Sequence, residues 1–346
     1  MTTEAKISFL ILFVLSVLTV QNSFSQSFFF LSLRPGIKSN AMGGTQSAIV
    51  NDYQSFYYNP AGLSRIKKGL LGFSNMKYSF ITFRYLLSFS GGAIRTKYGA
   101  MGFSTYFFSG QMFPFKQRSY QFSYARKIST NFHIGISVKY LYQNYYYDKS
   151  SVFAGDLGVL LTNILPGSTI KIPLKSIIGN VNKFIKNDFT GFTIGFSLLN
   201  TGYGKVEYPA ASPEPIPQML NLGLGYKIIE SDWLSTTLAM DLNKILVKIE
   251  NGKADNFIKA WFTSWQENGF DELHSGVDLN FFHLASIYFG YEKLYSIDSD
   301  NNDEFTFGFG IGPDFARLEA FYGGYPVYLP AEDREKTWRF GFNLSY

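Results

Sequence analysis

The last nine residues form the stretch that decides the fold: Trp338-Arg339-Phe340-Gly341-Phe342-Asn343-Leu344-Ser345-Tyr346. Large apolar side chains alternate with small or polar ones along its whole length. Because successive side chains of a strand point to opposite faces, this pattern predicts a strand with one apolar and one polar face. Such a strand is typical of the closing strand of an outer-membrane barrel, where the apolar face meets lipid and both edges are paired.

The same alternation recurs upstream and defines fourteen candidate strands in all. They are residues 70–78, 80–90, 98–109, 116–128, 132–146, 151–161, 189–200, 218–229, 233–246, 274–283, 285–295, 304–315, 317–323 and 337–346. An even number puts both ends of the barrel on the periplasmic side, as is usual in bacteria. We therefore predict an all-β, 14-stranded antiparallel transmembrane β-barrel over residues 68–346, in the outer membrane of a Gram-negative bacterium. The last strand should pair with the first, and deletion of Tyr346 should impair assembly.

The composition favours a barrel over other classes of protein. Charged residues make up only 16% of the chain, against about 25% in typical soluble proteins. The mean hydropathy of −0.01 excludes a helical membrane protein with many apolar spans, but alternating strands average to such a value. The absence of Cys excludes disulfides and thiol catalysis. The net charge of +5 comes from interspersed basic and acidic residues, so we expect a mild surface bias and no nucleic-acid partner.

The N-terminus resembles a secretory signal peptide. Lys6 precedes an apolar run at 7–20, and Ser23-Phe24-Ser25 offers small residues at the positions before a cleavage site. An uncleaved anchor is the alternative, but the run is shorter than the roughly 20 residues that a spanning helix needs. We therefore expect residues 1–25 to be removed and the mature chain to begin at Gln26.

Residues 26–67 do not alternate and are expected to form a compact N-terminal plug segment. Two motifs lie in it, Ala41-Met42-Gly43-Gly44-Thr45-Gln46-Ser47-Ala48 and Asn59-Pro60-Ala61-Gly62-Leu63. Glycine permits close packing and positive φ, while Asn59 can open a turn with Pro60 at the first helical position. The candidate plug residues are Met42, Gly43, Gly44, Asn59, Pro60 and Ala61. A periplasmic arm without special function is the alternative interpretation.

These two motifs, between a signal peptide and an aromatic barrel, resemble the FadL-type barrels and, within them, the PorV/PorQ family. Later stretches are similar to the same family, namely Ser197-Leu198-Leu199-Asn200-Thr201-Gly202, Leu220-Asn221-Leu222-Gly223-Leu224-Gly225-Tyr226 and Asp241-Leu242-Asn243-Lys244-Ile245-Leu246. The resemblance implies a component of the type IX secretion system. Its expected partners are a secretion translocon subunit and the C-terminal domains of secreted cargo, bound through the outer loops.

A second hypothesis is a FadL-like transporter that carries hydrophobic small molecules, with the plug as a gate. The predicted lumen faces carry mostly Gly, Ser, Thr and Asn, which weighs against an apolar pocket. A purely structural barrel is the third possibility. All three are non-enzymatic.

Two connections between the predicted strands have unusual composition. Residues 162–188 would form a long periplasmic insertion with a short amphipathic helix at 176–186, serving as a spacer or as a contact for a periplasmic partner. The outer loop 247–273 carries several large apolar residues, which solvated loops rarely do unless they fold onto themselves or bind a partner. Trp261, Phe262, Trp265 and Phe270 are therefore the candidate partner-binding residues.

Side chains that could carry chemistry are scattered along the sequence. His133, His274 and His283 lack metal-binding spacing, and we expect them at strand ends near the lipid–water interface. No G-x-S-x-G motif is present. The acidic loop 298–304 lacks the Gly and the closing Glu of an EF-hand. The sequence therefore predicts no catalytic residues, no metal site and no cofactor.

Overall fold

The computed structural model describes residues 28–80, 83–110, 115–145, 148–165, 170–172, 191–202, 215–231, 233–250, 253–266, 269–295, 303–323 and 337–345. The predicted signal peptide, Tyr346 and most of the acidic loop 298–304 lie outside these residues. No helix among the described residues is long and apolar enough to cross a membrane.

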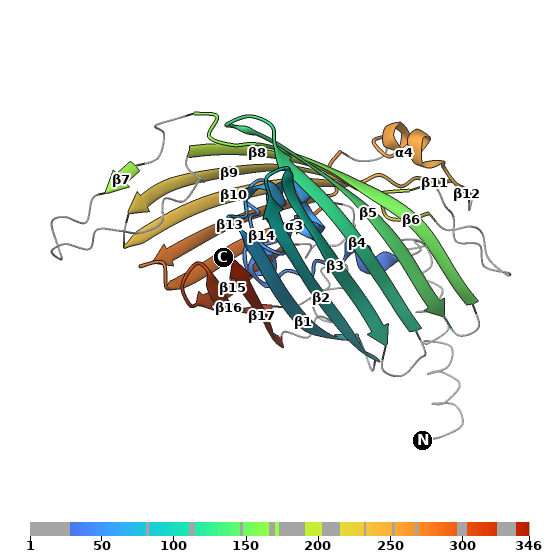
Figure 1. Cartoon of the computed structure of the whole chain (residues 1–346). Coiled ribbons are helices and arrows are strands. Elements are labelled where there is room, and N and C mark those ends of the chain that lie inside the picture. The colour runs from blue at the N-terminus through green and yellow to red at the C-terminus, as the bar shows by residue number, and fades with distance from the viewer. Residues whose placement is uncertain are drawn as a thin grey trace, which may run out of the picture.

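Fourteen long strands make up the barrel wall (Figure 1). They are β1 (Gly69–Phe80), β2 (Phe83–Thr96), β3 (Gly99–Gly110), β4 (Phe115–Lys127), β5 (Phe132–Tyr145), β6 (Asp148–Leu161), β8 (Gly191–Thr201), β9 (Met219–Ser231), β10 (Leu234–Ile245), β13 (Glu272–Phe281), β14 (Ala285–Leu294), β15 (Asp303–Ile311), β16 (Ala316–Gly323) and β17 (Thr337–Ser345). Each coincides with one of the fourteen predicted segments, with ends that differ by a few residues.

The wall is closed and every pair of neighbouring wall strands is antiparallel. Each strand pairs with the next one in the chain, including β9 with β10. The seam is formed by β1 and β17, with Phe73 opposite Phe342 and Asn75 opposite Phe340. The predicted 14-stranded antiparallel barrel, with its last strand paired to its first, is therefore confirmed.

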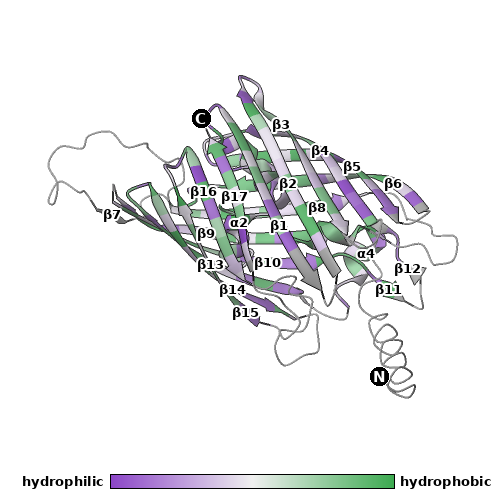
Figure 2. Cartoon of the chain, turned by 90° about the horizontal axis from the view of Figure 1, so that it is seen from below, coloured by the Kyte–Doolittle hydropathy of each residue, from purple (hydrophilic) through white to green (hydrophobic). Residues whose placement is uncertain are grey.

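Hydrophobic and hydrophilic residues alternate along the strands of the wall, as the sequence pattern predicts (Figure 2). In β15, Phe305 is 80% and Ile311 60% exposed, whereas Glu304 and Thr306, the neighbours of Phe305 on either side, are buried. In β17, Phe340 is 62% exposed and Arg339 is buried. An outward apolar surface on a closed antiparallel barrel with an even strand number belongs in the bacterial outer membrane. The barrel therefore lies in a lipid bilayer, as predicted.

The two ends of the barrel differ in their connections. At one end, here called the turn end, short turns at 97–98, 128–131, 282–284 and 312–315 join the strands, with the long connection 162–190 between β6 and β8 as the exception. At the other, here called the loop end, the connections include much longer ones at 202–218 and 246–271, beside two-residue connections at 81–82 and 146–147. Short turns face the periplasm and long loops face outward in bacterial barrels, so the turn end is periplasmic.

Three short strands and one helix lie outside the wall. β7 (Ile170–Ile172) runs parallel to the periplasmic end of β9. β11 (Ile249–Glu250) and β12 (Lys253–Ala254) pair with each other and precede α4 (Phe257–Thr263) in the outer loop. β7 and α4 lie at opposite ends of the barrel (Figure 1). The amphipathic helix predicted at 176–186 lies outside the described residues.

Residues 28–66, here called the inner segment, lie inside the barrel. They form the short helices η2 (Phe29–Ser32), α2 (Ile37–Ala41), α3 (Ser55–Tyr58) and η3 (Pro60–Arg65). Almost all their described side chains are buried. Because helices this short are not stable alone, their conformation depends on contacts with the wall.

A ring of glycines on the inward face of the wall makes room for the inner segment. A Cβ atom at any of these positions would touch the segment: Gly72, Gly91, Gly102, Gly135, Gly158, Gly195, Gly223, Gly276, Gly290, Gly308 and Gly341. At Gly276, for example, it would lie 2.7 Å from the Cβ atom of Met42. The missing side chains therefore allow the inner segment to approach the strand backbones directly.

Candidate functional site

The site is the interior of the barrel, where the inner segment meets the wall. Met42, Gly43 and Gly44 form a tight turn in which both glycines have positive φ, 68° and 97°. The backbone N–H of Gly43 donates to Oγ1 of Thr306 at 3.0 Å, and that hydroxyl donates to the carbonyl of Ala41 at 3.0 Å. The glycines are therefore required both by the backbone conformation and by the close approach to β13–β15.

The second predicted motif contacts the opposite side of the wall. Asn59 caps η3 through its side-chain oxygen, which accepts from the N–H of Ala61 at 3.1 Å, and Pro60 is the first residue of η3. The Asn59 amide also donates to the carbonyl of Val159 at 3.1 Å. The predicted cap and proline position are confirmed, and the same Asn ties the segment to β6. The role of both motifs in a plug stays a prediction.

A buried carboxylate on β10 fixes the middle of the inner segment. Oδ2 of Asp241 accepts from the backbone N–H of Gln46 at 2.9 Å and from that of Ser47 at 2.8 Å. Hydrogen bonds to a charged acceptor are stronger than neutral ones. Asp241 therefore satisfies two backbone donors that would otherwise be buried without partners.

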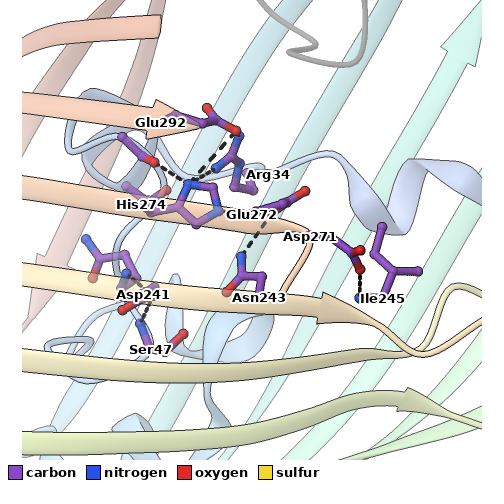
Figure 3. A network of polar contacts seen from close by, with 12 residues as sticks. Arg34, Ser47, Asp241, Asn243, Ile245, Asp271, Glu272, His274 and Glu292 are labelled. Atoms are coloured by element: carbon purple, nitrogen blue, oxygen red, sulfur yellow. Dashed lines mark hydrogen bonds and ion pairs between the residues drawn. The ribbon is translucent and has the colours of Figure 1, made fainter. Parts of the chain in front are cut away.

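A charged network joins the inner segment to β13 and β14 near the loop end (Figure 3). Arg34 forms an ion pair with Glu292, and its Nη1 lies 3.0 Å from Nδ1 of His274. The same Nδ1 lies 2.6 Å from the carbonyl of Gly43, and Nε2 lies 2.9 Å from a carboxylate oxygen of Glu272. All these side chains are buried. Buried charges are costly unless paired, so the network holds the segment in one position.

Two of the three histidines do not lie where the sequence analysis predicts them. His133 and His274 face the interior and are buried, so an interfacial position is wrong for both. His133 contacts the hydroxyl of Ser64 at 2.7 Å and lies 3.3 Å from that of Thr162. The alternation places both on the inward face because they share the parity of the inward glycines. A strand-end position alone could not have revealed this.

A further set of ion pairs lies at the periplasmic end, around Asp314 in the turn that joins β15 to β16. Asp314 accepts from His283 at 2.8 Å and pairs with Arg317 at 2.7 Å. Burial by itself raises the pKa of Asp314, but the hydrogen bond from His283 and the positive charge of Arg317 outweigh it. Together they lower the pKa of the carboxyl to about 2. The group is therefore ionised throughout the physiological range.

Beside β2–β4 the interior near the loop end is apolar, contrary to the expectation of a lumen lined mostly by Gly, Ser, Thr and Asn. The aromatic cluster, as we call it, consists of Tyr85, Leu87, Phe89, Tyr106, Phe108 and Phe115 of β2–β4 with Phe30, Leu31 and Leu33 of the inner segment. The rings of Phe30 and Tyr106 lie 4.9 Å apart, and those of Tyr85 and Phe108 stack at 5.3 Å. Such offset and stacked pairs stabilise apolar packing.

Sequence reasoning missed the aromatic cluster although its residues were visible in the strands. Both faces of β2 and β3 carry large apolar groups near the loop end, as in Leu86 and Leu87 or Phe107 and Phe108. The prediction of a lumen lined by small and polar residues assumes that only the outward face is apolar. Loss of alternation in these two strands was the signal that the lumen there is apolar as well.

The aromatic residues of the outer loop are divided between solvent and wall. Phe262 is 72% exposed. Nε1 of Trp261 donates to Oε1 of Gln218 at 2.9 Å, and the rings of Trp265 and Phe270 pack edge to face at 5.3 Å. Partner binding by this loop stays a prediction.

Within the ranges that the structure describes, no group of three His, Cys, Asp or Glu side chains could hold a metal ion.

A polar cavity of about 350 Å³ lies between the inner segment and the periplasmic halves of β9, β10, β13, β16 and β17. It is lined by charged residues of both signs, including Lys38, Asp52, Asp278, Arg317 and Glu319. Lys38 pairs with Asp278 at 2.7 Å, which anchors the inner segment at this end as well.

The barrel is similar in fold to solved structures of channels. The Ralstonia pickettii toluene transporter TbuX matches with a TM-score of 0.55 and 11% identity over 90% of this chain and 98% of that chain. The monoaromatic hydrocarbon channel CymD matches with a TM-score of 0.57 and 11% identity over 90% of this chain and 97% of that chain. A FadL homologue from Pseudomonas aeruginosa is also similar, with a TM-score of 0.47 and 11% identity.

No family model matches the sequence. No curated protein matches it either. The structural likenesses concern the fold alone, and they bear out the expected 14-stranded antiparallel outer-membrane barrel. The narrower likeness to PorV/PorQ is not shown by them.

Proposed function

We propose that this chain is an outer-membrane channel for small hydrophobic molecules, the second of the hypotheses drawn from the sequence. The observation that carries the proposal is the aromatic cluster inside the outer half of the barrel. A water-filled pore would have a polar interior, whereas binding sites for apolar ligands are lined by hydrophobic and aromatic side chains. The names of the two structural neighbours, a toluene transporter and a monoaromatic hydrocarbon channel, point to the same class of substrate.

In this proposal the inner segment acts as the plug. Phe30, Leu31 and Leu33 occupy the space that an apolar solute would take against β2–β4. Their backbone is also held, because the hydroxyl of Tyr57 donates to the carbonyl of Leu31 at 2.8 Å. A solute can enter the cluster only if it replaces these side chains, so binding and displacement of the inner segment are coupled.

The test is uptake of radiolabelled toluene and laurate by cells of a host that lacks channels of this kind. The protein should raise the initial uptake of at least one of them and leave glucose uptake unchanged. Leu87→Gln places an amide in the aromatic cluster and should lower hydrophobic uptake several-fold. Leu86→Gln, which changes the neighbouring residue on the outward face, is the matched control and should retain it. Equal uptake with and without the protein would refute the proposal.

A role in type IX secretion, the leading hypothesis from the sequence, has less support. The structural neighbours do not support a translocon or cargo partner. The observation in its favour is the exposed Phe262 on α4. Pull-down of the wild type and of Phe262→Ser with a cargo C-terminal domain tests it. Recovery of the domain by the wild type alone would favour secretion, and failure with both would remove this hypothesis.

A further inference from the structure

The acidic and basic residues are distributed unequally around the barrel. Between Asp52 and Asp148 the chain contains no Asp or Glu, but it contains twelve Lys and Arg. This stretch forms β1–β5, which are neighbours in the wall. The expectation of interspersed charges is therefore wrong for this third of the barrel.

Half of these cations gather at the periplasmic ends of β1, β2 and β4. The basic rim, as we call it, consists of Lys67, Lys68, Arg95, Lys97, Arg126 and Lys127, all of which are exposed. The register of the strands brings three of them to one level. The N–H of Arg95 donates to the carbonyl of Lys68 at 2.6 Å, and the pairings of Arg95 with Ala100 and of Ala100 with Ala125 lead across to Arg126. Because neighbouring strands lie about 4.8 Å apart, the six charges share a strip on the order of 20 Å wide.

No ion pair joins any residue of the basic rim to an acidic side chain among the described residues. Arg95 donates to the carbonyl of Ile66 at 3.0 Å, and the ammonium of Lys97 lies 4.9 Å from the ring centre of Tyr98. Neither contact neutralises the charge. The carboxylate of the neighbouring periplasmic turn, Asp314, is already paired with Arg317 and His283.

Exposed apolar side chains border the basic rim on the side of the membrane. Ile94 is 54%, Tyr98 62% and Ile128 52% exposed. The hydroxyl of Tyr124 donates to the carbonyl of Tyr98 at 2.6 Å and so fixes the turn that carries it. The outward apolar surface of the wall thus continues without a break up to the level of the six cations.

We propose that the basic rim is a binding surface for anionic phospholipid headgroups of the periplasmic leaflet. Clusters of four to eight Lys and Arg beside a membrane attract anionic lipids, each cation contributing roughly fivefold to the affinity. The apolar residues beside the rim receive the acyl chains while the cations receive the phosphates. An acidic protein segment would contact only the cations of the rim. A phospholipid would contact both the cations and the adjoining apolar residues, so the continuity with the lipid-facing wall favours a lipid.

The test measures lipids retained by the full-length barrel purified in detergent and mixed with phosphatidylglycerol or phosphatidylcholine, read by native mass spectrometry. The test variant changes four rim residues to Gln: Lys68, Lys97, Arg126 and Lys127. The control variant changes four exposed cations at the loop end to Gln: Lys77, Lys116, Lys149 and Lys293. Heat-dependent migration in gels verifies that all three barrels are folded.

The wild type and the control should retain phosphatidylglycerol at least tenfold more than phosphatidylcholine, and the test variant should lose this preference. High salt should reduce the preference of the wild type. Equal retention of the two lipids by the wild type, or the same preference in both variants, overturns the proposal. So does capture of an acidic periplasmic polypeptide by the wild type without any lipid preference, which would assign the rim to a protein.

Discussion

Substitution of Gly276 by Ala should separate the inner segment from the wall without unfolding the barrel. Gly276 lies on the inward face of β13. A methyl group there would overlap the carbonyl oxygen of Met42 and would lie 2.7 Å from the Cβ atom of Met42 and 2.8 Å from Oγ1 of Thr45. Ordinary van der Waals contact begins at 3.4 Å, so the turn must retreat by at least 3.4 − 2.7 = 0.7 Å.

The cost of this retreat follows from two sources. Overpacking a filled interior costs about 1–3 kcal/mol. The same movement strains two bonds between Gly43 and the wall, its N–H to Thr306 at 3.0 Å and its carbonyl to His274 at 2.6 Å, at about 1 kcal/mol each. The sum is about 3–5 kcal/mol. Because every 1.4 kcal/mol is a factor of ten, the population of barrels with a displaced segment should rise by more than two orders of magnitude.

Limited trypsin digestion measures this population. Arg34 and Lys38 are enclosed in the wild type, so peptides that end at either residue report displacement of the segment. Gly276→Ala should release them much faster than the wild type while the barrel keeps its folded gel mobility. Gly92→Ala is the matched control, because its methyl group would lie 3.4 Å from the nearest atom, Cδ1 of Leu71. Equal digestion of both variants would refute the reasoning about the glycine ring.

Three further predictions concern the charged groups. Asp241→Asn should weaken docking of the inner segment by about 2 kcal/mol, because a charged acceptor of two backbone N–H groups becomes neutral; hydrogen exchange of those amides measures it. Glu292→Met leaves Arg34 buried without its ion-pair partner and should lower the free energy of unfolding, measured in urea, by about 3–5 kcal/mol. The double variant Arg34→Met/Glu292→Met removes both charges and should recover most of this loss. The pKa of Asp314 is about 2 in the folded barrel and about 4 when unfolded. Its stabilising effect is therefore complete above about pH 4 and disappears as the pH falls to about 2, and Asp314→Asn should lack this acid-dependent part of the unfolding curve.

The wall of the barrel could be predicted from the sequence because its physics is local. Alternation in stretches such as 304–311 reports the two environments of a strand directly. The pairing of the last strand with the first followed from closure, since a membrane barrel leaves no strand edge exposed to lipid. Phe342 opposite Phe73 at the seam is the result. The cap at Asn59 was likewise a local signal.

The candidate site could be predicted only in part, because it depends on contacts between distant residues. The Gly43–Gly44 turn was recognised as tight, but nothing near it indicated that Thr306 and His274 would bind it. Arg34 pairs with Glu292, which lies 258 residues further along the chain. The aromatic cluster does not follow from strand alternation, because that pattern predicts lipid outside and small or polar residues inside. Two apolar faces on one strand require an apolar lumen as well as lipid.

The position of the inner segment in the chain has a consequence for the order of assembly. The segment ends immediately before β1, and β1 is also one side of the seam. The β1–β17 pairing joins parts of the chain that are about as far apart as the wall allows, and contacts of such long sequence separation form slowly. A segment enclosed by a finished cylinder cannot enter it through the wall. We therefore expect the segment to nest against the inward glycines before β17 reaches β1, so that the growing sheet folds around its own N-terminal residues.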